Sequence, residues 1–270
     1  MTSAGARRMR RTLTGALGAA WLVALAGASL QAQSADLPFA IGERLEYRVR
    51  VAGLGTIGRG TMWIEGPAEV RGHDAWVLRF DMKAGRGPFK AEDRTTSWID
   101  PERMASLRYT KTERHPLSRS SESVEMFPET GRWAEAGGDE GTSTSDAPLD
   151  ELSFMYFLRT IPIDADTTLR FDRHFDTARN PTLVRVVGRE RVTTEAGEYA
   201  TVVLEMRVRD PRRYRGEGVI RIHLSDDDAR VPVRIESRMP VVGTAVMSLS
   251  GRSPSAVDLA ETRPAAPALP

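Results

Sequence analysis

Residues 218–251 read GVIRIHLSDDDARVPVRIESRMPVVGTAVMSLSG, and this stretch decides the fold class of the chain. Between residues 220 and 224, apolar side chains alternate with polar ones, which is the period-two pattern of a strand with one buried face. The alternation resumes at 231–236 after an acidic turn, and a third such segment follows at 244–250 after a second turn. The stretch therefore predicts a meander of three antiparallel strands.

The same alternation recurs over most of the chain that precedes this meander. Further strand-like segments lie at 45–51, 61–65, 76–82, 94–99, 107–112, 124–127, 132–135, 168–173, 182–192 and 199–209. We expect an all-β, mainly antiparallel fold of about ten to thirteen strands, with 124–127 and 132–135 at an edge. Because the twist accumulates along consecutive hairpins, such a sheet curls into a half-barrel or a barrel-like form.

One internal helix is expected near residues 149–159, after the polar loop GGDEGTSTSD at 137–146. Asp146 is the predicted N-cap, and Pro148 falls in the first turn, where proline is tolerated. The helix is apolar on most sides, which is typical of a helix that is buried against the sheet.

The first 32 residues indicate export. Four arginines precede an apolar run rich in Gly and Ala, and Leu30-Gln31-Ala32 is an acceptable cleavage site. A retained anchor fits less well, because the run is short. The pair Arg10-Arg11 leaves Sec and twin-arginine export both open, and translation starting at Met9 would keep the signal intact. We predict a periplasmic protein, with secretion as the alternative.

Composition excludes several classes of function. The 270 residues include no cysteine, so a thiolate nucleophile, a thiolate metal site and disulfides are excluded. Without the four arginines of the signal, 34 basic residues face 37 acidic ones, and this near balance excludes a global field that would hold nucleic acid. We predict a single β-rich domain at 33–251 and a disordered Pro- and Ala-rich tail at 252–270.

Residues 53–58 match the dinucleotide pattern G-x-G-x-x-G. That motif holds pyrophosphate only where a helix follows the last glycine, because the helix N-terminus supplies the N–H donors. Here a strand-like segment follows at 61–65, which favours a glycine-rich hairpin or bulge over a cofactor site.

Other candidate sites have simple structural explanations. Asp226, Asp227 and Asp228 offer hard oxygens for calcium, but three adjacent residues favour a solvated turn. The histidines are His73, His115, His174 and His223; none pairs at a metal-ligand spacing, and His223 is expected on the surface of its strand.

Glu205, Arg207 and Arg209 line one face of a predicted strand, and Arg212, Arg213 and Arg215 follow it to form a basic patch. It could meet phosphate or an acidic sugar, although a solvated sheet face explains it as well. No G-x-S-x-G elbow is present, although a dispersed triad would leave no local signal. We therefore assign no catalytic, cofactor-binding or metal residue, expect no cofactor, and leave the ligand-binding residues open.

The order and spacing of several sequence segments resemble those of an exported bacterial family, domain of unknown function 3108. The most specific elements are Gly42-Glu43 before the first strand, Tyr156 to Arg159, Gly197 in a hairpin, and Asp228 with Arg230, Pro232 and Val233. The resemblance covers nearly all of 38–251 except 112–146. It implies a periplasmic, β-rich, single-domain protein and no particular activity.

Three functions remain open at this point. The first is a non-catalytic binding or carrier module for a lipid, another apolar molecule or a cell-envelope component, since a broadly apolar helix sits in a β-rich exported chain. The second is a structural or assembly factor that binds a partner protein at a strand edge. The third is a glycan-directed hydrolase with a dispersed site. The sequence does not determine the oligomeric state.

Overall fold

The computed structural model describes residues 37–87, 89–116, 118–163, 167–209, 217–239 and 243–253. The predicted signal segment at 1–32 and residues 254–270 of the tail predicted at 252–270 lie outside the described residues, whereas Arg252 belongs to the last strand. Every described residue belongs to one compact unit, which spans residues 33–270.

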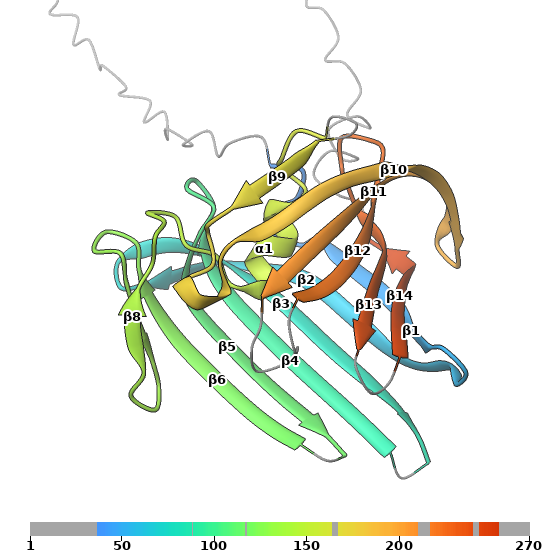
Figure 1. Cartoon of the computed structure of the whole chain (residues 1–270), viewed down its shortest axis with the longest axis horizontal. Helices are drawn as coiled ribbons and strands as arrows, with labels where there is room; N and C mark the ends of the chain where they lie inside the picture. Colours follow the sequence, from blue (N-terminus) through green and yellow to red (C-terminus); the bar gives the residue numbers. More distant parts are fainter. Residues whose placement is uncertain are drawn as a thin grey trace, which may run out of the picture. The chain divides into compact units, whose positions relative to one another are not determined.

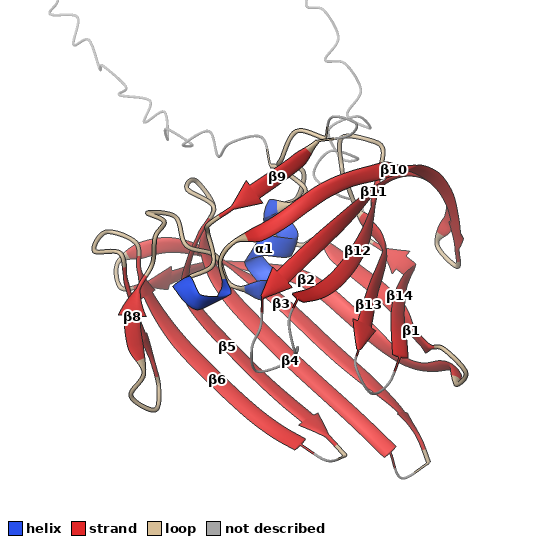
Figure 2. Cartoon of the chain, viewed as in Figure 1, coloured by secondary structure: helices blue, strands red, loops and turns tan. Residues whose placement is uncertain are grey.

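The strands among the described residues form one antiparallel sheet with fourteen members (Figures 1 and 2). In chain order they are β1 (Arg44–Val51), β2 (Gly55–Val70), β3 (His73–Arg86), β4 (Phe89–Asp100), β5 (Ala105–His115), β6 (Ser118–Phe127), β7 (Arg132–Glu135), β8 (Glu140–Thr142), β9 (Thr168–Phe171), β10 (Thr182–Thr194), β11 (Gly197–Arg209), β12 (Glu217–Ser225), β13 (Pro232–Met239) and β14 (Gly243–Arg252). The predicted all-β antiparallel class and the opening meander, β12 to β14, are confirmed.

Two meanders share this sheet, and the ends of the described chain join them. The order is β8-β7-β6-β5-β4-β3-β2-β1-β14-β13-β12-β11-β10-β9, so β1 pairs with β14, with Val49 opposite Met247. The sheet curls but does not close, and its two edges are β8 and β9. Figure 1 shows β2 to β6 on one side of the helix α1 (Glu151–Phe157) and β9 to β11 on the other. The predicted half-barrel with an internal helix is therefore confirmed.

The prediction that residues 124–127 and 132–135 lie at an edge of the sheet is wrong, because β6 and β7, which contain them, both lie inside it. The additional strand, β8, falls in the segment predicted as a polar loop, and it pairs with β7. Gly141 makes this pairing possible: a Cβ there would lie 2.7 Å from Cζ2 of Trp133. A side chain at this position would displace the indole, so the glycine lets the two backbones approach.

The helix begins later than predicted, at Glu151, with Asp150 rather than Asp146 as its N-cap. Pro148 lies before the helix. The physical reason is a local backbone pairing: the Leu149 N–H donates to the Arg173 carbonyl at 2.6 Å, and the Leu149 carbonyl accepts from Phe175 at 3.1 Å. This bridge holds the chain extended up to residue 149, so the first helical turn forms only after it.

Helix α1 packs on both halves of the curled sheet. Leu152 and Tyr156 belong to an apolar cluster with β1 to β4 and β14, whereas Phe154 and Leu158 belong to a second cluster with β10 to β12. A short helix can contact both halves of the sheet in this way because it is apolar on most sides. No helix in the described residues has the length and apolar content required to cross a membrane.

Candidate functional site

A cavity of about 280 Å³ lies on the concave side of the sheet, beside α1. Its apolar wall comes from α1 and from strands on both sides of it: Met62, Phe80, Leu152, Phe154, Met155, Met206, Val208, Ile220, Ile235 and Met247. Strand periodicity builds this wall, because Met62 pairs with Phe80, Met206 with Ile220 and Ile235 with Met247 across neighbouring strands. The four methionine side chains are flexible and can adapt to different apolar shapes.

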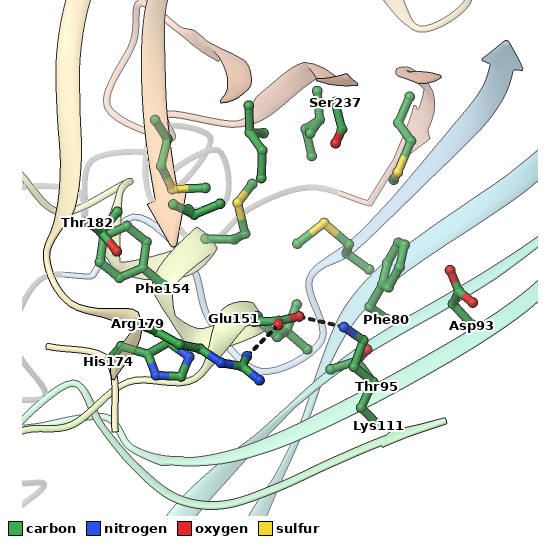
Figure 3. Close-up of a pocket in the computed structure, with 18 of the residues that line it drawn as sticks. Phe80, Asp93, Thr95, Lys111, Glu151, Phe154, His174, Arg179, Thr182 and Ser237 are labelled. Atoms are coloured by element: carbon green, nitrogen blue, oxygen red, sulfur yellow. Dashed lines mark hydrogen bonds and ion pairs between the residues drawn. The ribbon is translucent and has the colours of Figure 1, made fainter. Parts of the chain in front are cut away.

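The opposite end of the cavity is polar and charged (Figure 3). Strands β4 and β5 place Thr95 opposite Lys111, and Asp93 opposite Glu113, on the concave face. The helix supplies Glu151 at its first turn, and the short 3-10 helix η1 (Thr177–Arg179) supplies Arg179. The concave face of the sheet is therefore apolar on most strands and polar on β4 and β5.

Glu151 connects the two cations of this polar end. One carboxylate oxygen lies 2.6 Å from Nζ of Lys111, and the other lies 3.1 Å from Nη1 of Arg179 (Figure 3). Lys111 also lies 3.2 Å from Glu113, and Arg179 lies 3.8 Å from Glu122. Because the Lys111 and Arg179 side chains are only 11% and 7% exposed, these pairs are poorly screened by solvent.

Burial shifts two carboxyl groups of this region toward the neutral form. It raises the pKa of Asp93, an effect that the hydrogen bond with His115 at 2.7 Å partly offsets. It likewise raises the pKa of Glu122, with Arg179 acting in the opposite direction. Burial in this region therefore disfavours the charged form of both carboxyl groups.

His174 is a neutral imidazole on the cavity wall. Its Nδ1 accepts a hydrogen bond from the Asp176 N–H at 3.0 Å, which leaves the proton on Nε2. Nε2 is closed off from solvent and has no hydrogen-bond partner among the described residues. Burial, reinforced by the charge of Arg179, lowers the pKa of His174 to about 4.

A buried cap sets the position of Glu151. The Asp150 carboxylate accepts from the N–H groups of Leu152 and Ser153 at 2.9 Å, which is the N-cap geometry. Its second oxygen accepts from the hydroxyls of Ser97 and Ser106, on β4 and β5. Burial raises the pKa of Asp150, and these hydrogen bonds lower it in part. The cap thus ties the start of α1 to the polar strands of the cavity.

A buried ion pair holds the other end of the helix. Arg159 pairs with Glu43 through two contacts, at 2.6 and 2.8 Å, and donates to the carbonyls of Pro38 and Ala229 at 2.9 Å. Sequence reasoning found Gly42-Glu43, residues 156–159 and the Asp228 turn only as separate elements of a resemblance. The structure brings them together.

The other sequence candidates do not form a site. Gly53 lies in the turn between β1 and β2, Gly55 begins β2, and Gly58 lies within it. A Cβ on Gly58 would come within 2.3 Å of the Lys83 carbonyl of β3, so this glycine permits close strand packing. The glycine pattern is the hairpin that was predicted.

The acidic turn directs its carboxylates to different partners. Asp226 lies 3.0 Å from Nε of Arg189, whereas Asp227 accepts from the Ser225 hydroxyl at 2.6 Å and from the Arg230 N–H at 3.0 Å. No group of three or more His, Asp or Glu side chains in the described part of the chain has an arrangement that could hold a metal ion.

The histidines occupy separate environments. His73 lies 3.9 Å from Glu129 on the surface, and His115 pairs with Asp93. The surface position predicted for His223 is wrong: the residue is 4% exposed, with Nδ1 3.1 Å from Glu190. The cross-strand register places Val203 of β11 and Arg234 of β13 on either side of His223. These neighbouring residues shield the imidazole from solvent.

The charged strand face is organised around one carboxylate. Glu205 is 7% exposed, and it lies 3.4 Å from both Arg207 and Arg221. Arg209 lies 3.9 Å from Glu217 and also contributes to the cavity lining. Arg212, Arg213 and Arg215 lie outside the described residues.

Sequence reasoning missed the polar end of the cavity. A signal for it exists in β4 and β5, where Asp93, Thr95, Lys111 and Glu113 occupy positions at a spacing of two that an ordinary half-buried strand fills with apolar residues. Arg179 and His174 carry no such signal, because they come from an irregular segment.

The family model described as "Protein of unknown function (DUF3108)" matches residues 46–250. The chain belongs to this family. No curated protein compared with it shows significant similarity. Among solved structures, the DUF3108 chain is similar to a beta-barrel-like protein of domain of unknown function DUF1849 from Brucella abortus, with 11% identity, a TM-score of 0.50, and coverage of 78% of this chain and 96% of that one. That likeness concerns the fold alone.

A more distant likeness is to a putative exported protein with a YmcC-like fold from Bacteroides fragilis. It shares 12% identity at a TM-score of 0.33, over 81% of the DUF3108 chain and 98% of the other.

Proposed function

We propose that this protein is a non-catalytic binding module of the bacterial cell envelope that holds an amphipathic ligand, such as a lipid, against the concave face of its sheet. The observation that carries the proposal is the cavity beside α1, which has an apolar wall and a charged end. Sites for small molecules combine a mainly apolar lining with a few placed polar groups in this way.

The size of the cavity favours a slender ligand. Its volume of about 280 Å³ is near the lower end of small-molecule sites, which span roughly 300–1,000 Å³. A single acyl chain is slender enough, and each methylene that leaves water contributes about 0.8 kcal/mol to binding. Flexible methionines on the wall support such a ligand, because they can repack around it.

The cellular location in this proposal rests on the first 32 residues, whose charged start and apolar run are typical of a cleaved export signal. Export to the periplasm places the protein among lipids and other envelope components, with secretion as the alternative.

Binding of a partner protein at a strand edge is the second candidate. Its support is the open sheet, whose edge strand β9 pairs only with β10 among the described strands. An exposed strand edge can add a strand from another protein.

Native mass spectrometry of the full chain, expressed with its N-terminal segment and purified without detergent, tests the first proposal. We expect a co-purifying species of lipid-like mass, and saturable binding of the fluorescent apolar probe N-phenylnaphthylamine that added amphiphile reverses. Protein that is consistently free of ligand and does not bind the probe would contradict the proposal.

A further inference from the structure

The outer face of strands β1 to β6 carries a row of basic side chains near one end of the sheet. The cross-strand register joins one residue of each strand into this row, which reads from β1 to β6 as Arg48, Arg59, Lys83, Glu92, Arg114 and Arg119. Asp93 and Glu113 line the cavity on the concave face, so the strand alternation directs their neighbours Glu92 and Arg114 to the outer face. Neighbouring strands lie about 4.8 Å apart, and the row therefore extends over about 24 Å.

Most cations of this region have no acidic partner. Arg48 lies 2.9 Å from Glu195, but no ion pair within the described ranges includes any of the other basic residues in or beside the row: Arg50, Arg59, Lys83, Lys90, Arg114 and Arg119. These six residues are exposed. Like charges that face each other across strands destabilise a sheet, and the register sets Arg59 opposite Lys83 and Arg114 opposite Arg119. A bound anion would relieve this repulsion.

The positive charge is local to this end of the outer face. The whole chain has 38 basic and 37 acidic residues, so its composition does not explain the excess of cations here. The next carboxylate on this face, Asp81, already lies 3.9 Å from Arg94. A shallow hollow at the ends of β4, β5 and β6 is lined by Glu92 and by three of the cations: Lys90, Arg114 and Arg119. Concentrated charge of one sign attracts an extended partner of the opposite sign.

An exposed leucine lies beside these cations. Leu54 is 47% exposed in the turn between β1 and β2, whose strands carry Arg50 and Arg59. Nη1 of Arg86 donates to the Leu54 carbonyl at 3.5 Å, so this turn lies beside the end of β3. Binding at a membrane interface combines buried apolar area with the attraction of cations to anionic lipids. A soluble polyanion would leave Leu54 in water, and the leucine therefore favours a membrane as the partner.

We propose that the six exposed cations and Leu54 form a basic surface that docks the protein on a bilayer containing anionic phospholipid. The phosphate groups of the lipids lie against the row, and Leu54 enters the boundary between head groups and acyl chains. Figure 1 shows β2 to β6 side by side, and β1 continues the sheet next to β2. The inference goes beyond the proposed function, because the row and the cavity lie on opposite faces of the sheet.

Binding to vesicles of two compositions tests the lipid. The full chain is titrated with vesicles of phosphatidylcholine alone and with vesicles that contain about 30 mol% phosphatidylglycerol, and bound protein is measured by sedimentation. We expect at least about tenfold tighter binding to the anionic vesicles in about 0.1 M salt, and loss of most of this preference in about 1 M salt, where the Debye length falls to about 3 Å. Equal binding to both kinds of vesicle, or binding to neither, would overturn the proposal.

Neutralising the hollow tests the basic surface itself. We expect the triple variant Lys90→Gln/Arg114→Gln/Arg119→Gln to lose at least about tenfold in affinity for the anionic vesicles. A matched control removes three exposed cations from β9 and β10, with the same change in net charge, and should lose less than about twofold: Arg170→Gln/Arg185→Gln/Arg191→Gln. Every protein compared keeps the same N-terminus, so the N-terminal arginines contribute equally. Equal losses in the two triple variants would show that net charge alone holds the protein on the vesicle, which contradicts the proposal.

Leu54 separates a membrane from a soluble polyanion. Leu54→Ser should weaken binding to the anionic vesicles several-fold, because the variant no longer buries an apolar side chain, and should not affect binding to dextran sulfate. Dextran sulfate that competes fully with the vesicles, together with unchanged vesicle binding by Leu54→Ser, would assign the basic surface to a soluble polyanion and overturn the proposal. Thermal melts verify that all variants are folded. Binding of N-phenylnaphthylamine tests the cavity separately and does not depend on these outcomes.

Discussion

Arg159 and Glu43 lie 116 residues apart in the chain and form a bidentate ion pair with contacts of 2.6 and 2.8 Å. Their side chains are 0% and 1% exposed. The guanidinium also lies over the ring of Phe39, 5.0 Å from its centroid. One side chain thus connects the end of α1, the segment before β1 and the acidic turn of the C-terminal meander.

Breaking this pair should destabilise the fold strongly. We expect Glu43→Gln to reduce the free energy of unfolding by about 3–5 kcal/mol, because it leaves a buried guanidinium without its counter-charge. Chemical denaturation measures the change. Glu46→Gln is the matched control, since Glu46 pairs with Arg44 on the surface at 3.3 Å, and we expect a loss under about 1 kcal/mol. Similar losses in both variants would contradict the buried role.

Asp150, rather than Asp146, should be the residue on which the helix depends. Asp150→Ala removes the cap, worth up to about 2 kcal/mol. It also leaves the buried Ser97 hydroxyl without its acceptor and removes one of the two acceptors of the Ser106 hydroxyl. We therefore expect a loss of more than about 2 kcal/mol in denaturant unfolding. Asp146→Ala, at the predicted but incorrect cap, should lose less than about 1 kcal/mol. A reversed order would show that the cap is misassigned.

The buried His174 should weaken the fold in acid. Its folded pKa of about 4 lies below the value of 6.5 that an unfolded histidine shows, so the unfolded chain binds more protons between these two values. The contribution of His174 to the free energy of unfolding is therefore fully present above pH 6.5. It is lost as the pH falls toward 4, because the unfolded chain takes up a proton that the folded chain does not. Unfolding measured at pH 7 and pH 4.5 should show a smaller decrease for His174→Asn than for the original chain. Equal decreases would show that this histidine does not titrate as described.

Filling the cavity should weaken ligand binding without unfolding the protein. Ile235→Trp replaces a branched aliphatic side chain on the β13 wall with a larger indole ring, and we expect at least a tenfold loss of affinity for N-phenylnaphthylamine, measured by fluorescence titration. Leu54→Trp is the control, because Leu54 is 47% exposed in a turn and does not line the cavity. Undiminished probe binding in a folded Ile235→Trp variant would place the probe elsewhere.

The strands were predictable because their evidence is local. In β12, for example, Ile222 and Leu224 are fully buried, as the alternation in this stretch indicates. The start of α1 was not predictable, because the backbone bridge between Leu149 and residues 173–175 delays it. The burial of His223 also depends on neighbouring strands, which a pattern within one strand does not contain.

The sequence by itself determined the antiparallel class, the opening meander and the presence of one broadly apolar helix. These features follow from the spacing of apolar residues along the chain, which repeats every two residues in a strand and every 3.6 residues in a helix. Only the tertiary structure decided which strands meet, and hence that Glu43 pairs with Arg159 and that Glu151 connects Lys111 with Arg179. Those contacts join residues 28 to 116 positions apart. They depend on which strands pair and on where the helix lies within the curled sheet, and no local pattern encodes either.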